Sequence, residues 1–240
     1  FRGVSLKYKN AGEESLTGMD FAVKRGETVG IIGGTGSGKS SLVNMIPRFY
    51  DASAGEVLIG GRDVKSFEIP ELRERIGIVP QKAVLFKGSI RDNMRWGKDD
   101  ATDDEILAAA KTAQAADVIE SKGGLDFEIE QGGKNLSGGQ RQRFTIARAL
   151  VRKPEILILD DSASALDFAT DAALRKSIRE MDTNPTVFIV SQRTSSIQHA
   201  DKIIVLDDGK IAGIGKHDEL LNSCPVYSEI YNSQFKKEAV

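Results

Sequence analysis

The stretch ETVGIIGGTGSGKSSLVNMIPRFY, residues 27–50, decides the fold of this chain. It opens with an apolar run typical of a buried strand and closes with residues typical of a helix. Between the two, GGTGSGKS at residues 33–40 matches the phosphate-binding loop pattern of glycine, four residues and then Gly-Lys-Ser. A flexible glycine turn is the alternative, but the flanking strand and helix are the context that the pattern requires. The stretch therefore predicts a strand, a loop and a helix that together bind phosphate.

Each part of this loop has a physical role toward a nucleotide. The glycines let successive backbone N–H groups turn inward on the phosphates, and the helix N-terminus adds its positive dipole end. Lys39 is expected to reach the outer phosphates, and the Ser40 hydroxyl is expected to bind Mg²⁺. The candidate phosphate-binding residues of this segment, which the family resemblance described below assigns to ATP, are Gly33, Gly34, Thr35, Gly36, Ser37, Gly38, Lys39, Ser40 and Ser41.

A second apolar run, ILILDDSASALD at residues 156–167, ends in two adjacent carboxylates. Asp160 stands at the end of the predicted strand, where we expect it to hold the hydration shell of the Mg²⁺ ion. Buried strands often end in an acid at the first solvated position, so the run alone is weak support. Combined with the loop at residues 33–40, it favours a site that binds nucleotide phosphates together with Mg²⁺.

The composition excludes several classes of protein. The chain has 240 residues, and its 33 basic and 35 acidic side chains give a net charge of −2, so no nucleic-acid partner is expected. Cys224 is the single cysteine, which excludes an internal disulfide and favours a packing role. No apolar stretch approaches the ~20 residues of a membrane-spanning helix, and residues 1–10 do not resemble a signal peptide. We expect the chain to be a domain of a longer protein.

Recurring short apolar runs indicate an α/β core. Near-continuous runs such as ILIL and VFIV suit parallel strands that are buried on both faces. Strands are expected at residues 3–8, 20–24, 27–34, 56–61, 75–81, 155–161, 186–192, 202–209 and 210–216.

Between Val84 and Val151 the pattern becomes helical, which predicts a helical lobe inserted into the sheet. Thr102 and Glu105 are spaced as a capping box at the start of this lobe. Helices are expected over residues 102–121 and 141–153, and an amphipathic helix over residues 225–240.

The chain resembles the ATP-binding cassette (ABC) ATPases, because NLSGGQRQR at residues 135–143 stands upstream of ILILDDSASALD at the spacing seen in that family. The LSGGQ motif is highly specific to these ATPases, and the resemblance covers nearly the whole chain. Two further phrases, LFKGSIRDNM at residues 85–94 and GKHDELL followed by VYSEIYNSQ, are similar to the exporter branch.

The resemblance implies roles for further residues. Tyr8 resembles the aromatic residue that stacks on adenine, Gln81 resembles the Q-loop glutamine that binds ATP and metal, and Asp167 resembles the D-loop aspartate. Tyr8 could instead cover the edge of the sheet, and Gln81 could cap a turn after Pro80. The signature residues implied to act on the ATP of a partner domain are Leu136, Ser137, Gly138, Gly139 and Gln140. A serine hydroxyl and unhindered N–H groups at a helix start suit a second phosphate clamp.

The same resemblance implies the organisation of the chain and its partners. It implies a phosphate-binding-loop NTPase core with a mixed, mainly parallel sheet flanked by helices, an N-terminal antiparallel β subdomain and an inserted helical subdomain. We expect a single nucleotide-binding domain over residues 1–240, with the core in 1–83 and 152–240 and the helical subdomain in 84–151. The expected partners are a second nucleotide-binding domain and the transmembrane domains of an exporter, with a membrane domain upstream. The implied location is the cytoplasmic face of the cell membrane.

Two positions depart from the family pattern. Asp161 stands where the family usually has a glutamate that orients the attacking water, and Gln192 stands where it typically has a histidine that contacts the γ-phosphate. An aspartate is one methylene shorter than a glutamate, and a misplacement of about 1 Å can cost ~10²-fold in rate. A glutamine can hydrogen-bond a phosphate but cannot become cationic. The candidate catalytic residues are therefore Lys39, Asp161 and Gln192, in a site expected to hydrolyse ATP slowly.

Three functions remain open from the sequence. The favoured one is the degenerate half of a heterodimeric ABC exporter, whose intact LSGGQ completes the site of its partner. The alternatives are a non-hydrolytic module that dimerises on ATP, and a soluble ABC ATPase of DNA repair or chromosome structure. The last is disfavoured because the chain has neither sustained heptads nor a basic excess.

Asp161 could still act as the base after a small backbone shift. Glu130 and Gln131 also depart from the exporter pattern, in the loop that contacts membrane domains in that branch.

Overall fold

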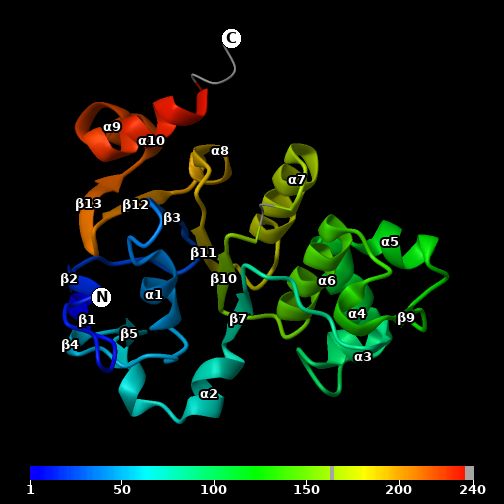
Figure 1. Cartoon of the computed structure of the whole chain (residues 1–240). Helices are drawn as coiled ribbons and strands as arrows, with labels where there is room; N and C mark the ends of the chain where they lie inside the picture. The colour runs from blue at the N-terminus through cyan, green and yellow to red at the C-terminus, as the bar shows by residue number, and fades with distance from the viewer. Residues whose placement is uncertain (163–164, 236–240) are drawn as a thin grey trace. The chain divides into compact units, whose positions relative to one another are not determined.

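The computed structural model describes residues 1–162 and 165–235, and these belong to two compact units (Figure 1). The first unit comprises Phe1–Arg75 and Thr186–Val240, and the second comprises Ile76–Pro185. Ser164 of the predicted D-loop and residues 236–240 of the predicted C-terminal helix lie outside the described residues. None of the helices in the described part of the chain is long and apolar enough to cross a membrane.

Strand β3 (Thr28–Gly33) is the centre of the first unit, and all of its residues are buried. It pairs in parallel with β11 (Thr186–Val190) and with β12 (Lys202–Asp207), and β12 pairs antiparallel with β13 (Lys210–Gly215). Side chains such as Ile31 lie opposite branched apolar neighbours on both sides, as expected for strands covered on both faces. These strands confirm the predicted mixed, mainly parallel sheet.

An antiparallel sheet is formed from the N-terminal part of the chain, as predicted. It has the order β2-β1-β4 and consists of β1 (Arg2–Leu6), β2 (Leu16–Met19) and β4 (Ala54–Glu56). Between β4 and Arg75 the chain forms β5 (Leu58–Ile59), β6 (Arg62–Asp63), a short 3₁₀ turn at Val64–Ser66, and α2 (Ile69–Glu74).

The strand predicted at residues 20–24 is wrong. The strand lies earlier, at Leu16–Met19, where it pairs with β1. Beyond it, the Phe21 N–H donates to the Phe1 carbonyl at 3.1 Å, and the two phenyl rings stack. Residues 20–24 are thus not part of a strand.

The described part of the first unit is completed by helices α1 (Lys39–Asn44), α8 (Thr194–Ile197), α9 (His217–Ser223) and α10 (Pro225–Phe235). Helix α1 is shorter than the sequence suggests, because the chain turns after Met45 and reaches a left-handed φ of 56° at Arg48. Cys224 is a buried free thiol between α9 and α10, as predicted.

The second unit is mostly helical and is built on two parallel strands, β7 (Ile76–Val79) and β10 (Ile156–Asp160). Its helices are α3 (Ile90–Arg95), α4 (Asp103–Thr112), α5 (Ala116–Ser121), α6 (Gly138–Leu150) and α7 (Phe168–Arg179), with a two-stranded β8 (Gly88–Ser89) and β9 (Glu128–Ile129) and a 3₁₀ turn at Gln131–Gly133. Helix α6 packs against α3, α4 and β7, and its Phe144 is fully buried.

Capping boxes fix the starts of three of these helices. The box predicted at Thr102 and Glu105 is confirmed, and equivalent pairs begin α3 and α6. The continuous helix predicted over residues 102–121 is instead two helices, because Gln114 adopts a left-handed φ of 57° that ends α4. The predicted boundaries of the helical subdomain, 84 and 151, stay a prediction.

Candidate functional site

The loop after β3 folds around its own lysine. The Lys39 ammonium donates to the carbonyl oxygens of Gly33 at 2.9 Å and of Gly34 at 2.6 Å, and it lies 3.4 Å from the Ser37 hydroxyl. Gly38, which precedes α1, has a φ of 92° that L-residues rarely adopt. The loop thus places a positive charge and the start of a helix at the carboxyl end of a buried strand, which suits an anion.

Tight packing explains two of the loop glycines. A Cβ on Gly33 would lie 2.1 Å from the Leu206 carbonyl oxygen on the neighbouring strand β12. A Cβ on Gly38 would lie 2.5 Å from the Leu16 side chain. Gly34, in contrast, faces open space. Gly33 and Gly38 are therefore required because neighbouring atoms leave no room for a Cβ, whereas the space around Gly34 is open.

Tyr8 lies beside helix α1, which follows the phosphate-binding loop. Its hydroxyl is 2.7 Å from the Ser41 hydroxyl on α1, and its ring packs edge-on against Tyr50 at 4.9 Å between centroids. The structure thus brings together two of the predicted ATP-binding residues, Tyr8 and Ser41, which are 33 positions apart in the sequence.

Gln192 follows β11, the parallel neighbour of β3. The carboxyl ends of parallel neighbours meet at one edge of a sheet, so Gln192 and the loop at residues 33–40 share that edge. The Ser191 N–H donates to the Ile31 carbonyl at 3.0 Å and fixes the start of this segment. The side chain of Gln192 is exposed, which is the state expected of a group that meets a ligand.

In the second unit, two predicted residues contact each other directly. The Gln81 side-chain amide donates to Asp161 Oδ2 at 3.1 Å, across 80 positions of sequence. Asp160 is the last residue of β10, and Asp161 follows with a left-handed φ of 47°. Aspartate is one of the few residues that adopt this backbone readily. The sequence did not predict this contact or this backbone.

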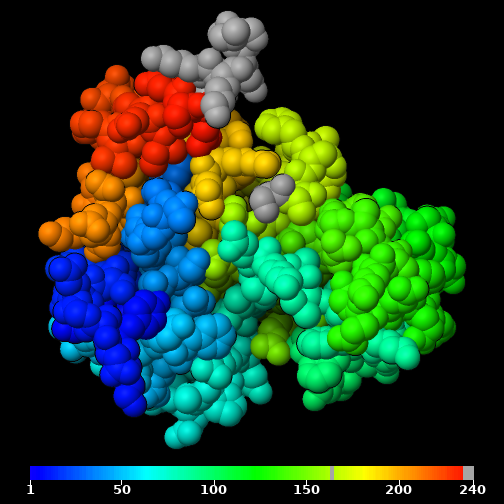
Figure 2. All heavy atoms as spheres, in the orientation of Figure 1, coloured from blue at the N-terminus to red at the C-terminus, as the bar shows by residue number. Residues whose placement is uncertain are grey.

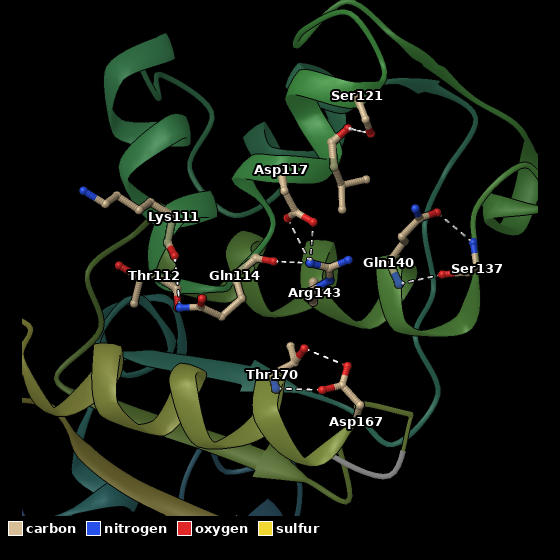
Figure 3. Close-up of polar contacts among 11 residues, drawn as sticks. Lys111, Thr112, Gln114, Asp117, Ser121, Ser137, Gln140, Arg143, Asp167 and Thr170 are labelled. Atoms are coloured by element: carbon tan, nitrogen blue, oxygen red, sulfur yellow. Dashed lines mark hydrogen bonds and ion pairs between the residues drawn. The ribbon is translucent and has the colours of Figure 1, made fainter.

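The LSGGQ residues form the start of α6 (Figure 3). The Gln140 N–H donates to the Ser137 hydroxyl at 3.2 Å, and the Gln140 side chain accepts from the Ser137 N–H at 2.9 Å. Leu136 is buried just before the cap. No acidic residue lies in the first turn of α6, and Gly138 and Gly139 add no bulk there. The helix therefore presents an unneutralised positive dipole end.

The sequence also did not predict the polar network behind this helix start. Arg143 of α6 forms an ion pair with Asp117 at 2.9 Å and donates to the Gln114 carbonyl (Figure 3). The Gln114 side chain donates in turn to the Ser177 hydroxyl on α7 at 2.9 Å. The left-handed backbone at Gln114 makes this junction between α5, α6 and α7 possible. No local sequence pattern predicts it.

Asp167, the predicted D-loop residue, caps helix α7. Its carboxylate accepts from the Thr170 N–H and from the Thr170 hydroxyl, both at 2.8 Å (Figure 3). These hydrogen bonds, the one from the Thr170 backbone above all, hold the pKa of Asp167 below its ordinary value. Asp167 is thus a charged cap at neutral pH.

Comparison with known proteins identifies the family. The sequence profile described as "ABC transporter" matches residues 16–164, which is more than half of the chain. The chain belongs to the ABC transporter family. The family resemblance and the fold class predicted from the sequence are thereby confirmed.

Two relatives and a solved structure show the same likeness. The ABC transporter chain is 44% identical over 239 residues to "Uncharacterized ABC transporter ATP-binding protein YfiB" of Bacillus subtilis, which covers 99% of this chain and 41% of YfiB. It is 42% identical over 235 residues to "Putative multidrug export ATP-binding/permease protein YgaD" of Bacillus subtilis, covering 98% and 40%. A structure described as "a bacterial Atm1-family ABC exporter with ATP bound" superposes with a TM-score of 0.92 at 39% identity, covering 98% and 41%. The chain thus spans about two-fifths of these proteins.

Proposed function

We propose that this chain is the ATP-binding and ATP-hydrolysing domain of an ABC exporter, and that it dimerises around ATP to power export. The observation that carries the proposal is the loop at residues 33–40, in which Lys39 is held at the carboxyl end of β3. The names of YgaD and of the Atm1-family structure support export as the process. The proposed partners are transmembrane domains and a second nucleotide-binding domain, at the cytoplasmic face of a membrane.

The proposal includes Mg²⁺, and the donor groups fit that ion. Mg²⁺ prefers hard oxygen ligands and usually keeps several waters beside one or two carboxylates and the phosphates of its substrate. The Ser40 hydroxyl, the Asp160 carboxylate and the Gln81 carbonyl oxygen are such ligands, and Gln81 donates to Asp161 through its nitrogen, so its oxygen stays an acceptor. The ion would neutralise charge on the phosphates, while Tyr8 stacks on the adenine.

We further propose that the nucleotide site of this chain hydrolyses ATP slowly. Asp161 is one methylene shorter than the usual glutamate, and its carboxylate is already engaged by Gln81 at 3.1 Å. Gln192 can donate to a phosphate oxygen but cannot carry a proton to it. Both groups assigned to the γ-phosphate and its water are thus altered, while the phosphate-binding loop is intact. The second candidate, a non-hydrolytic dimerisation module, rests on the same two positions.

The signature at the start of α6 is proposed to act on ATP held by a partner domain with a different sequence. The first turn of α6 contains no acidic residue, and Gly138 and Gly139 carry no bulky side chain. The helix start therefore suits a second clamp on the phosphates of the partner's ATP. In this arrangement the chain contributes to hydrolysis that it does not itself perform.

Titration of the 240-residue chain with Mg-ATP, together with measurement of phosphate release, tests the first part. We expect binding with little turnover, weaker binding in Lys39→Ala, and unchanged binding in Lys111→Ala, a matched change at an exposed helix position.

Asp161→Glu should restore part of the rate of hydrolysis, and Gln192→His added to it should restore more than the sum of the single changes. Rapid turnover by the unaltered chain would contradict the slow site, and absence of turnover in the double variant would favour the dimerisation module.

A second experiment tests the division of labour in the transporter assembled with its partner. Gly138→Asp places a carboxylate against the proposed γ-phosphate contact, so ATPase activity and transport should collapse. Asp161→Asn keeps the shape of a group that is expected to contribute little, so most activity should survive. The reverse pattern of losses would refute the proposed roles of the two sites.

A further inference from the structure

The side chain of Gln234, in the last described turn of α10, uses both ends of its amide on the segment that follows β11. Its carbonyl oxygen accepts from the Thr194 N–H at 2.9 Å and from the Thr194 hydroxyl at 3.0 Å. Its nitrogen donates to the Gln192 carbonyl at 2.7 Å. Gln234 is the last residue of the phrase VYSEIYNSQ, which is similar to the exporter branch, and it has no role in the proposed function.

These hydrogen bonds satisfy a helix start that has no local cap. Helix α8 begins at Thr194, and the residue before it, Arg193, makes no capping hydrogen bond with its side chain. The first N–H groups of a helix have no partner within the helix, and Thr194 is completely buried, so an unmet N–H there would be costly. Gln234 supplies the missing acceptor from 40 positions further along the chain.

Helix α10 is well placed to hold this contact. Tyr227 lies seven residues before Gln234, which puts both on one face of the helix. The Tyr227 side chain is fully buried, and its hydroxyl is 2.7 Å from His217 Nδ1 on α9. Figure 2 shows the red atoms of α10 lying directly on the gold atoms of the segment around residues 190–200. Residues of α10 also lie close to residues of α8.

We infer that Gln234 is a positioning residue for Gln192. It fixes the backbone on both sides of Arg193, while the Gln192 side chain stays exposed at the edge of the sheet that carries the phosphate-binding loop. The C-terminal helix thereby sets the direction of the side chain that is assigned to the γ-phosphate. This last step rests on the proposed function, whereas the fixing of the backbone does not.

Amide hydrogen exchange of the nucleotide-free 240-residue chain tests the backbone contact. In Gln234→Leu the Thr194 amide should exchange at least ten times faster than in the unaltered chain, because its acceptor is gone. Gln234→Glu keeps an acceptor for Thr194 but loses the donor to Gln192, so it should preserve most of the protection. Asn232→Leu is the matched control, since it makes the same amide-to-leucine change at an exposed position of the same helix. Unchanged protection of Thr194 in Gln234→Leu would overturn the inference.

Nucleotide affinity tests the consequence for Gln192. The ratio of ATP to ADP affinity should fall about threefold to tenfold in Gln234→Leu and in Gln234→Glu, which is the effect of losing about one hydrogen bond to the γ-phosphate. ADP affinity and the behaviour of Asn232→Leu should not change. An equal loss of ATP and ADP affinity would mean a merely structural role and would overturn the inference. If the unaltered chain did not prefer ATP, the role proposed for Gln192 would fail, and Thr194 exchange would still decide whether Gln234 holds the backbone.

Discussion

Replacement of Gly33 by alanine should strongly destabilise the chain, although it adds only one methyl group. Gly33 is the last residue of β3 and lies opposite Leu206 in the parallel ladder. The new Cβ would stand 2.1 Å from the Leu206 carbonyl oxygen and 2.6 Å from Ser37 Oγ. The nearest obstacle is backbone in the middle of the sheet, which cannot rotate away as the end of a side chain can.

The size of the effect follows from this geometry. An ordinary contact between carbon and oxygen is more than 1 Å longer, so one of two hydrogen-bonded strands must move by about that amount. Overpacking of a filled core costs about 1–3 kcal/mol, and a clash with backbone belongs at the upper end. For a chain of this length, ~1 kcal/mol lowers the melting temperature by about 2–4 °C. We therefore expect a loss of about 3 kcal/mol and a decrease of roughly 6–12 °C.

The assay is thermal unfolding followed by circular dichroism, without nucleotide. Gly34→Ala is the matched control, because the adjacent glycine faces open space and has no positive φ. This variant should unfold within about 2 °C of the unaltered chain or slightly above it, since alanine also restricts the unfolded state. A Gly33→Ala chain that melts together with the Gly34→Ala chain would refute the packing argument.

Three other predictions follow from caps and buried groups. Ser137→Ala removes the N-cap of α6 and should cost about 1 kcal/mol in the free energy of unfolding; a change below the error of denaturant unfolding would contradict the cap. Burial raises the pKa of Tyr227 to about 12, so the stability that it contributes is complete below pH ~10 and decreases as the pH rises through 12. Tyr227→Phe should abolish this alkaline decrease and, by losing the bond to His217, cost about 1 kcal/mol at pH 7; persistence of the decrease would assign it elsewhere. Because the pKa of Asp167 is lowered, the stability that it contributes is present above pH ~4 and is lost as the pH falls through the folded-state pKa. Thr170→Val should raise that pKa in an NMR titration, and an unshifted titration would exclude the Thr170 hydroxyl as a cause.

Local patterns predicted the elements whose causes are local. The apolar run of β3, the glycines after it and the capping box at Thr102 each contain their own structural reason within a few residues. The failures also have local explanations that only the structure reveals. The strand at Leu16–Met19 contains Gly18 with a φ of 61°, which hides it from propensity, and the left-handed Gln114 divides a helix that composition would continue.

Contacts between distant residues were not predictable in the same way. The hydrogen bond from Gln81 to Asp161 spans 80 positions and depends on where two parallel strands end. The contact from Gln234 to Thr194 spans 40 positions and depends on how α10 packs. The sequence identified the residue types at the candidate site, because motif and spacing carry that information. The sequence did not identify the residues that hold the site residues in place. Many amide side chains could make such hydrogen bonds, and only the fold decides which of them is close enough.

The capping box at the start of α6 leaves one atom of Ser137 uncommitted. In the box the serine oxygen acts only as an acceptor, for the Gln140 N–H. The hydroxyl hydrogen takes no part in the cap, because the hydroxyl has one proton to donate besides two lone pairs. A serine at this position can therefore cap its own helix and donate to an external anion at the same moment. Aspartate is an equally good N-cap, but it has no proton to offer and would repel the anion.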